Sequence, residues 1–320
     1  MGGKKSGSRQ LWLVLLMAAS FAVVFLFPAP RQRVGTVAFA AATAHDAQVA
    51  VVGNSVVTHV SKCDADRRAI PAMLQDALAS EVVDLSYGGE PLAESINYAA
   101  IALQQPRIRT VVLYLGQGSL ANPDPNDWQT TAFFGLVAGP LRVNDLSARL
   151  SRGTGITPGA ATARLPFRYE GVDYPGYDQI QMTWFADEKA RQGCPETLGH
   201  DRRFIEANFW TNLVRPQPYW PLLEDIGDLQ RQADARGKRL VVLFLPNDMA
   251  GLRTLDAGLA AQVDARRAEI VRRAAAFGVA VTEIAPFSPD QFADRWCACG
   301  HLSQSGRLAV AAATKDVLVN

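Results

Sequence analysis

Short apolar runs alternate with longer amphipathic segments over much of this chain. The runs at residues 49–52, 81–85, 109–115, 238–245 and 279–284 each have the length of a strand. They are mostly continuous, without polar residues at every second position, which is typical of strands buried on both faces of a parallel sheet. The pattern therefore predicts about five buried parallel strands.

Apolar residues recur at helical spacing between these runs. Ile96, Ala99 and Leu103 mark a helix over residues 92–104. Further helices are predicted at residues 202–213, 221–236 and 259–276, and from Ser303 or Ser305 through Val317. This alternation predicts the α/β class, as a flavodoxin-like three-layer fold with about five parallel strands and helices on both faces.

One more helix is predicted soon after the first strand. Ser61 is placed to cap a helical turn that carries Asp64 and Asp66, and carboxylates are favoured at the positive end of a helix. Pro71 would break or restart that helix, with residues 71–74 as a new first turn.

The regular alternation stops between residues 119 and 200. This stretch is rich in Pro, Gly, Asp and aromatic residues and holds only short helical candidates, such as residues 143–150. Loops of this length are uncommon in compact domains unless they are functional or flexible. We interpret the stretch as an insertion over the carboxyl edge of the sheet. Its aromatic rings suit a small satellite core, which we slightly favour, or a sugar-binding cleft.

An uncharged apolar segment lies near the N-terminus, at residues 11–27. As a helix it would be about 25 Å long, close to the lower limit for spanning a bilayer. Three basic residues precede it and two follow, which favours a cytoplasmic N-terminus. We therefore predict a single-pass inner-membrane protein, with a tail at 1–10, an anchor at 11–28, a linker at 29–47 and a periplasmic domain at 48–320.

A cleaved signal peptide is the alternative for this segment. Small-x-small sites at residues 38–40 and 42–44 would allow cleavage, after which the domain would be secreted. We favour the anchor because the apolar run is longer than an ordinary signal-peptide core and basic residues intervene before these sites.

Charge and cysteine content limit the choice of partners. The 320 residues carry a formal net charge of +1 and no basic stripe with interleaved aromatics, which argues against nucleic acid. In an oxidising compartment the four cysteines, Cys63, Cys194, Cys297 and Cys299, are expected to form disulfides, but the sequence leaves their pairing open. Cys297-x-Cys299-x-His301 is too tightly spaced for an ordinary tetrahedral zinc site, so we expect no metal and no cofactor.

Candidate catalytic residues stand near the ends of predicted strands. Ser55 follows the first strand, and His301 follows the last strand and precedes the final helix. Ligands gather beyond the carboxyl ends of strands in open α/β sheets. A serine hydroxyl becomes a nucleophile when a histidine accepts its proton, so we expect Ser55 and His301 to be neighbours. His59, four residues after Ser55, is a less favoured alternative base.

With these blocks in this order, the sequence resembles the SGNH (GDSL-like) hydrolase superfamily. The matching positions are Gly53-Asn54-Ser55 for the first block Gly-Asp-Ser, Gly89 for the second-block glycine, Gly116-Gln117-Gly118 at the place of the third block Gly-x-Asn, and His301 for the terminal histidine. The ending His301-Leu302-Ser303-x-x-Gly306 is most similar to the periplasmic, membrane-anchored branch, which includes alginate and cellulose acetylation proteins and the D-alanyl transfer protein of teichoic acids.

The chain departs from this family at two functional positions. Gly118 replaces the block-three asparagine, which removes a side-chain oxyanion donor unless Gln117 substitutes for it. The family places its triad aspartate three residues before the histidine, where this chain has Ala298. Asp294 aligns with that aspartate if Cys297 and Cys299 form a short extruded turn. If it does not, the site is a Ser–His dyad or an inactive relic.

The resemblance implies a serine-dependent acyl-transfer enzyme, either an esterase or an O-acetyltransferase. Ser55 would form the acyl-enzyme, His301 would act as base and then acid, and Asp294 would orient His301. The oxyanion would be bound by N–H groups of Ser55 and Gly89 and by Gln117. We expect an acetyl group, an acceptor that is water or a hydroxyl of an exported polysaccharide or cell-envelope glycan, and a membrane-bound acyl-donor protein.

Two further readings stay open. The missing aspartate and asparagine motivate a non-catalytic, membrane-tethered assembly or glycan-binding protein that kept the fold. A disulfide from Cys63 to the Cys297–Cys299 turn would join the two halves of the site.

Overall fold

The computed structural model describes residues 46–61, 63–88, 92–120, 167–169, 171–174, 202–215, 218–285, 287–293, 298 and 300–320. The predicted tail, membrane anchor and almost all of the predicted linker lie outside these residues, as does most of the predicted insertion. None of the described helices is long and apolar enough to cross a membrane.

Five parallel strands form the central sheet, in the order β2-β1-β3-β6-β7. Their bounds are β1 Val49–Val52, β2 Val82–Asp84, β3 Thr110–Leu115, β6 Arg239–Phe244 and β7 Val281–Glu283. The predicted parallel sheet is therefore confirmed, and each strand lies inside its predicted apolar run. A small antiparallel pair, β4 Phe167–Tyr169 and β5 Val172–Tyr174, lies within the stretch predicted as an insertion.

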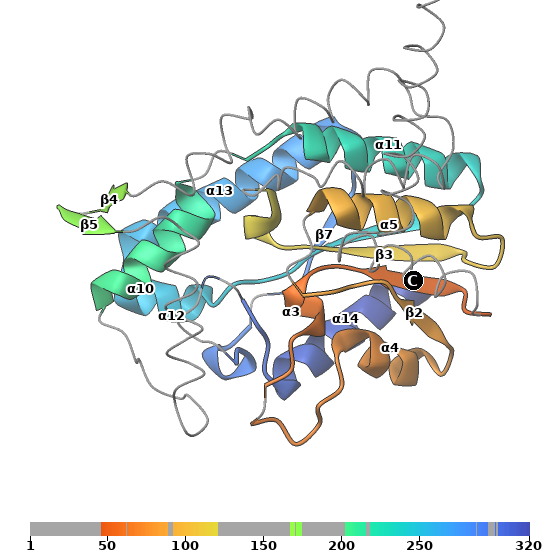
Figure 1. Cartoon of the computed structure of the whole chain (residues 1–320), viewed down its shortest axis with the longest axis horizontal. Coiled ribbons are helices and arrows are strands. Elements are labelled where there is room, and N and C mark those ends of the chain that lie inside the picture. Colours follow the sequence, from red (N-terminus) through yellow and green to blue (C-terminus); the bar gives the residue numbers. More distant parts are fainter. Residues whose placement is uncertain are drawn as a thin grey trace, which may run out of the picture.

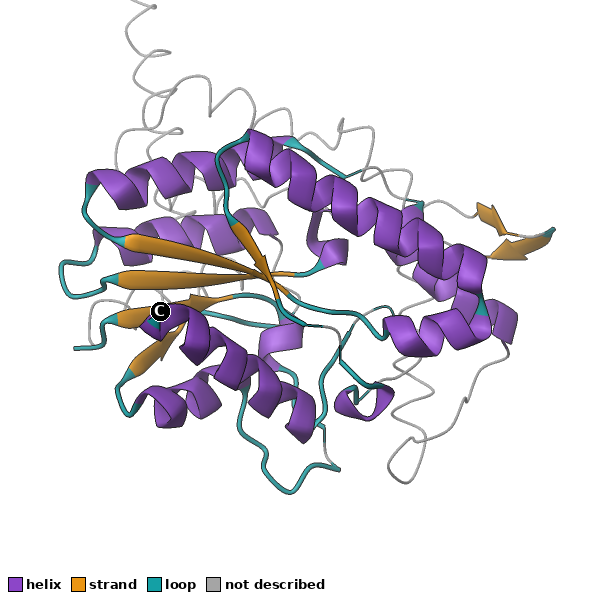
Figure 2. Cartoon of the chain, turned by 180° about the vertical axis from the view of Figure 1, so that it is seen from behind, coloured by secondary structure: helices purple, strands orange, loops and turns teal. Residues whose placement is uncertain are grey.

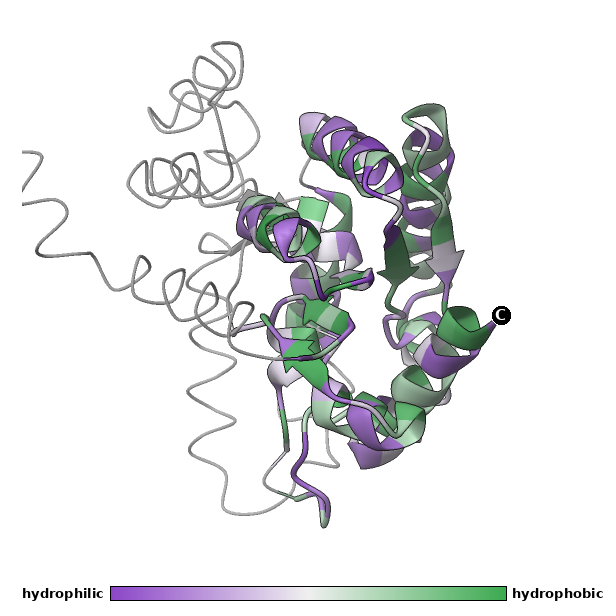
Figure 3. Ribbon diagram, turned by 90° about the vertical axis from the view of Figure 1, so that its right-hand side faces the viewer, coloured by the Kyte–Doolittle hydropathy of each residue, from purple (hydrophilic) through white to green (hydrophobic). Residues whose placement is uncertain are grey.

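Side chains of the central strands point alternately into two apolar cores, as the pleat of a strand requires. Figure 1 shows helices α5 (Leu92–Gln104) and α11 (Pro221–Ala235) on one face and α4 (Ile70–Leu78) and α14 (Gln304–Val319) on the other. On β3, Val111 and Leu113 belong to the first core, and Val112 and Tyr114 to the second. Hydrophobic colour follows the strands in Figure 3, whereas the helices carry both kinds of residue. The three-layer prediction is thus confirmed.

A third apolar cluster extends the molecule on one side of the sheet. It joins α10 (Arg202–Phe209), the π-helical turn η2 (Trp210–Val214), α12 (Met249–Leu255) and α13 (Ala257–Ala276). Figure 2 shows the long α13 running across this side. The prediction of one helix over residues 202–213 is right in position, but its second half is wound as a π-helix, and α12 was not predicted.

The predicted helix beginning at Ser61 is wrong. A single short helix, α3 (Ser55–Thr58), precedes it, and the described residues from Ser61 to Ala69 form a loop before α4 begins. The backbone carbonyls of Asp66 and Arg68 in this loop accept hydrogen bonds from the Arg307 guanidinium, which draws them away from a helical pattern. Pro71 lies in the first turn of α4, where its missing N–H costs nothing.

Strand order places the carboxyl end of β1 at the switch point of the sheet. β1 lies between β2 and β3, so the chain builds outward from it in both directions. The crevice beyond such a switch point is the usual ligand site of an open α/β sheet.

Candidate functional site

The turn after β1 presents Ser55 at this switch point. Asn54 caps α3, its Oδ1 accepting from the backbone N–H of Val56 at 3.1 Å, so Ser55 is the first residue of the helix. A Cβ on Gly53 would lie 2.6 Å from Cγ2 of Val57 and 3.3 Å from Cβ of Tyr114. Only glycine fits here, because the turn packs closely between α3 and β3.

The structure brings Ser55 and His301 together although 246 positions separate them in the sequence. Nε2 of His301 lies 3.2 Å from Oγ of Ser55, within hydrogen-bonding distance. His301 is 2% exposed, whereas Ser55 is half-buried and keeps contact with the outside. The pair therefore combines a shielded imidazole with a reachable hydroxyl.

The chain just before His301 is held by two buried asparagines. Oδ1 of Asn208 accepts from the backbone N–H of Ala298 at 2.9 Å, and Nδ2 of Asn247 donates to the carbonyl of Ala298 at 3.2 Å. Asn208 comes from α10, and Asn247 follows β6. Both backbone groups of Ala298 are thus fixed by neutral amides. We call Asn208, Asn247 and Ala298 the amide clamp.

Gly300 links the amide clamp to the histidine. Its φ of +67° is in the left-handed region, which glycine adopts without steric cost. A Cβ at this position would lie 3.2 Å from Nδ2 of Asn247. Glycine therefore serves the backbone turn and the close approach of the amide at the same time.

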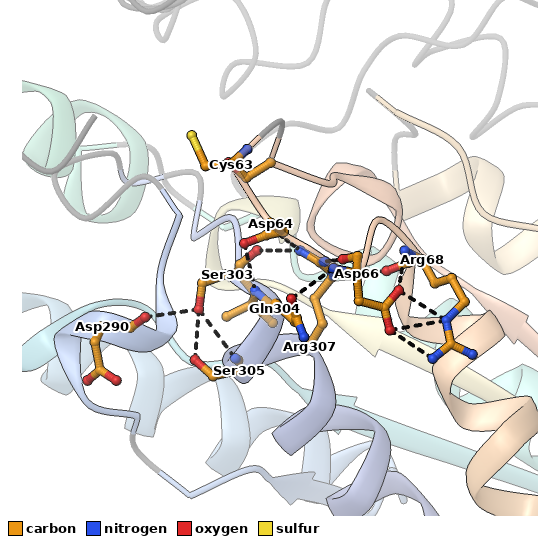
Figure 4. A network of polar contacts seen from close by, with 12 residues as sticks. Cys63, Asp64, Asp66, Arg68, Asp290, Ser303, Gln304, Ser305 and Arg307 are labelled. Carbon is orange, nitrogen blue, oxygen red and sulfur yellow. Dashed lines mark hydrogen bonds and ion pairs between the residues drawn. The ribbon is translucent and has the colours of Figure 1, made fainter. Parts of the chain in front are cut away.

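The chain just after His301 is held by a buried charge. Arg307 in α14 is 0% exposed, and its Nη1 lies 2.7 Å from Oδ2 of Asp64 in the α3–α4 loop. The same guanidinium donates to the backbone carbonyls of Arg68 at 2.9 Å, Asp66 at 2.7 Å and Leu302 at 3.1 Å. Figure 4 shows Arg307 reaching from the helix into this loop. An ion pair with these additional hydrogen bonds satisfies the buried guanidinium.

Gln304 strengthens the same connection. Its backbone N–H donates to Oδ1 of Asp64 at 3.2 Å, and its Oε1 accepts from the backbone N–H of Asp66 at 2.9 Å. We call Asp64, Asp66, Gln304 and Arg307 the charged clamp. At the outer edge of this clamp, side-chain hydrogen bonds from Arg68 lower the pKa of Asp66 to about 2. The charged clamp ties the loop after Ser55 to the helix after His301.

Backbone pairing with residues 292–293 also holds His301 in place. The His301 carbonyl accepts from the N–H of Ala293 at 2.9 Å, and Phe292 pairs with Leu302 in an antiparallel bridge. Ser303 caps α14, its Oγ accepting from the N–H of Gly306, as expected from the predicted helix start. The segment that leads to Asp294 is therefore adjacent to the histidine along its backbone.

A second histidine lies flat against the first. The rings of His59 and His301 have centroids 4.0 Å apart and planes that differ by 8°. His59 ends α3, and its backbone N–H donates to the carbonyl of Ser55 at 2.7 Å. The sequence offers His59 as an alternative base, but its contact with His301 is between ring faces, and the ring nitrogen at hydrogen-bonding distance from Ser55 Oγ belongs to His301.

The turn after β3 directs the side chain of Gln117 away from an oxyanion role. Gln117 is buried in η1 (Gln117–Leu120), and its Nε2 donates to the carbonyls of Leu213 at 3.4 Å and Val263 at 3.1 Å. Both amide hydrogens are engaged there, so the expected oxyanion role of its side chain has no support in this geometry. The hydroxyl of Ser119 in the same turn lies 3.3 Å from Nδ2 of Asn54, the residue that precedes Ser55 in the chain.

Two predicted site residues, Gly89 and Asp294, lie outside the described part of the chain, so their roles stay predictions. Cys63 is disulfide-bonded, but the other three cysteines also lie outside the described residues and its pairing stays open. No group of three or more His, Cys, Asp or Glu side chains suited to a metal ion occurs within the described ranges.

Sequence reasoning missed the residues that hold the site in place. Asn208 lies in a segment for which the sequence predicted a helix but no functional residue. Arg307 lies among apolar positions of α14. An arginine on the apolar face of a helix is a signal of a buried ion pair. Asn247, just beyond a strand end, could have been singled out in the same way as Ser55.

No protein-family model and no curated protein matches the chain. Among solved structures, it is similar to a lipase/acylhydrolase from Enterococcus faecalis, with 10% identity, a TM-score of 0.37, and coverage of 85% of this chain and 95% of that one. It is also similar to LAE5, an alpha/beta hydrolase enzyme from the metagenome of Lake Arreo, Spain, with 10% identity, a TM-score of 0.38, and coverage of 86% and 96%. Likenesses of this strength carry no argument about function.

Proposed function

We propose that the protein is a serine-dependent esterase or acyltransferase in which Ser55 is the nucleophile and His301 the base. The observation that carries this proposal is the 3.2 Å contact between Nε2 of His301 and Oγ of Ser55 at the switch point of a parallel sheet. Nothing in a purely structural role requires a half-buried hydroxyl to face a shielded imidazole at the rim where ligands gather.

The chemistry follows from this pair. Oγ of Ser55 attacks the carbonyl carbon of an ester while Nε2 of His301 accepts the hydroxyl proton. The tetrahedral intermediate collapses when His301 returns this proton to the leaving alcohol, which leaves an acyl group on Ser55. Water or an acceptor hydroxyl then attacks the acyl-enzyme, with His301 again taking the proton and finally restoring it to Ser55.

The oxyanion needs donors that are fixed before the reaction. The backbone N–H of Ser55 is one, because an α-helix leaves its first N–H groups without intrahelical acceptors. The N–H of Gly89 is the second expected donor. We assign to the Ser119 hydroxyl the role of side-chain oxyanion donor that the sequence predicted for Gln117. Since Nδ2 of Asn54 can only donate, the Ser119 oxygen accepts from it and keeps its own proton for another acceptor.

The substrate class is proposed from the sequence. The resemblance to membrane-anchored acetylation proteins supports an acetyl group and an acceptor hydroxyl on an exported polysaccharide or cell-envelope glycan. The apolar segment at residues 11–27 supports an inner-membrane anchor, a periplasmic domain and a membrane-bound protein that supplies the acyl donor. Asp294 is proposed to orient His301 through its other ring nitrogen.

Hydrolysis of a chromogenic acetyl ester tests the proposal. We expect activity in the wild-type protein and a loss of at least about 1,000-fold in kcat for Ser55→Ala, because the nucleophile is removed. Ser80→Ala, at an exposed serine after α4, is the matched control and should retain full activity. Equal rates for Ser55→Ala and the wild type would end the proposal. If the wild-type protein is inactive and polysaccharide binding survives Ser55→Ala, the protein would instead be the tethered binding protein.

A further inference from the structure

The proposed mechanism uses the imidazole of His301 but not its stacking contact with His59. His59 and Ser55 are the two ends of one hydrogen-bonded helical turn, joined by the 2.7 Å bond from the His59 N–H to the Ser55 carbonyl. The same turn therefore makes two contacts with His301. Ser55 contacts the edge of the imidazole at Nε2, and His59 packs against its face.

These two contacts restrain the imidazole in different directions. A hydrogen bond at Nε2 fixes one point of the ring but allows the ring to tilt and rotate about that point. The χ2 torsion of histidine is broad, so the side chain does not limit this motion strongly. A parallel ring at 4.0 Å blocks tilt toward its own side and holds the plane of His301 within 8° of a surface fixed to α3.

The stack also bears on charge. His301 becomes an imidazolium each time it takes a proton from Ser55 or from the acceptor. A neutral aromatic face beneath a cation attracts it through the ring quadrupole. The His59 ring, whose centroid lies 4.0 Å from that of His301, would attract the imidazolium in this way when it forms during the reaction.

We infer that His59 is a positioning residue of the acyl-transfer site, holding the His301 ring by face-to-face stacking so that Nε2 stays directed at Ser55. This inference rests on the proposed function. It explains how the base is oriented by a group on the nucleophile's own helical turn, whatever carboxylate serves its other nitrogen.

Substitutions at position 59 separate stacking from other roles. His59→Ala removes the ring, and His59→Phe keeps an aromatic face that can neither accept nor donate a proton. Thr58→Ala, on the neighbouring residue of the same turn, is the matched control. With the acetyl ester, we expect His59→Ala to lower kcat by roughly 3- to 30-fold with little change in KM, the range for loss of one ring-to-cation contact. His59→Phe should recover most of this loss.

A second readout does not depend on activity. The protein has four histidines, so their ring proton signals can be assigned by single substitutions. In the Ser55→Ala background the His301 ring protons should be shifted by the ring current of His59. The shift should disappear in His59→Ala and return in His59→Phe, while thermal unfolding identifies any variant that fails to fold.

Recovery by His59→Phe of both kcat and the ring-current shift would support the inference. Equal kcat values in wild type, His59→Ala and His59→Phe overturn it, and so does an equal loss in the two variants, which would mean that the imidazole itself is needed. If the wild-type protein does not hydrolyse the ester, the proposed function fails, and an unchanged His301 resonance in His59→Ala would then separately show that the rings do not stack.

Discussion

The two flanks of His301 are held by opposite kinds of chemistry. Upstream, the amide clamp fixes the backbone of Ala298 with two neutral side chains. Downstream, the charged clamp fixes the loop after Ser55 with a fully buried guanidinium. The comparison shows that a single side chain, here the proposed base His301, can be placed by one flank that sets its local backbone and another that sets which distant segment it faces.

The two clamps differ in what their loss should cost. A neutral amide can be removed at the cost of one unsatisfied backbone group. Removing one partner of a buried ion pair leaves an uncompensated charge, which is far more expensive. We therefore expect the charged clamp to dominate stability and the amide clamp to have its clearest effect on activity.

Arg307→Met should be the most damaging substitution. Methionine supplies an unbranched apolar side chain, but Oδ2 of Asp64 and three backbone carbonyls lose the Arg307 donor. We expect a loss of about 3–5 kcal/mol in the free energy of unfolding, measured by urea denaturation. Arg253→Met breaks the exposed pair with Asp264 and should cost about 1 kcal/mol or less. Similar losses in the two variants would contradict the importance assigned to the charged clamp.

Asn208→Ala should weaken the other flank to a smaller extent. The buried N–H of Ala298 would lose its acceptor, at a cost of about 1–3 kcal/mol in unfolding free energy. Because His301 lies three residues further on, kcat should fall while KM changes little. Asn212→Ala, which loses only a bond to the Asn208 carbonyl within the same segment, is the control. Loss of stability with fully preserved kcat would show that the amide clamp does not position the histidine.

Gly300→Ala tests the turn between the amide clamp and His301. An alanine at a φ of +67° should cost about 1–2 kcal/mol, and its Cβ would press on Nδ2 of Asn247. Gly237→Ala, which has a φ of +62° but no atom within 4 Å of the added Cβ, is matched in backbone strain. We expect comparable losses in thermal stability from the two variants but reduced esterase activity only in Gly300→Ala. Reduced activity in both variants would contradict the idea that Gly300 affects activity through the turn before His301.

The smallest effect should come from the outer edge of the charged clamp. Hydrogen bonds from Arg68 lower the pKa of Asp66 from 3.8 to about 2, so the folded protein binds this proton more weakly than the unfolded chain. The stabilisation is complete above about pH 4 and is lost as the pH falls toward 2. Unfolding midpoints of wild type and Asp66→Asn should therefore converge over this window. A constant difference between them would contradict the assignment.

Features of the fold and site that depend on local sequence patterns could be predicted, whereas contacts between residues far apart in the sequence could not. The strands were predicted because apolar runs such as 49–52 report burial locally, and Ser55 and His301 were paired because the carboxyl ends of parallel strands share one edge. The loop at Ser61 was misassigned because its carbonyls bind Arg307, more than 200 residues away in sequence. Asn208 meets Ala298 across 90 residues with no periodic signal, so no local pattern could reveal it.

The most direct test of the central claim is the rate at which a fluorophosphonate labels the protein, with the modified residue located by mass spectrometry. If His301 activates Ser55, the wild type is labelled at Ser55, and His301→Gln, which keeps a polar side chain but no base, is labelled at least about 100-fold more slowly. Label on another residue, or an equal rate at Ser55 in His301→Gln, would contradict the claim.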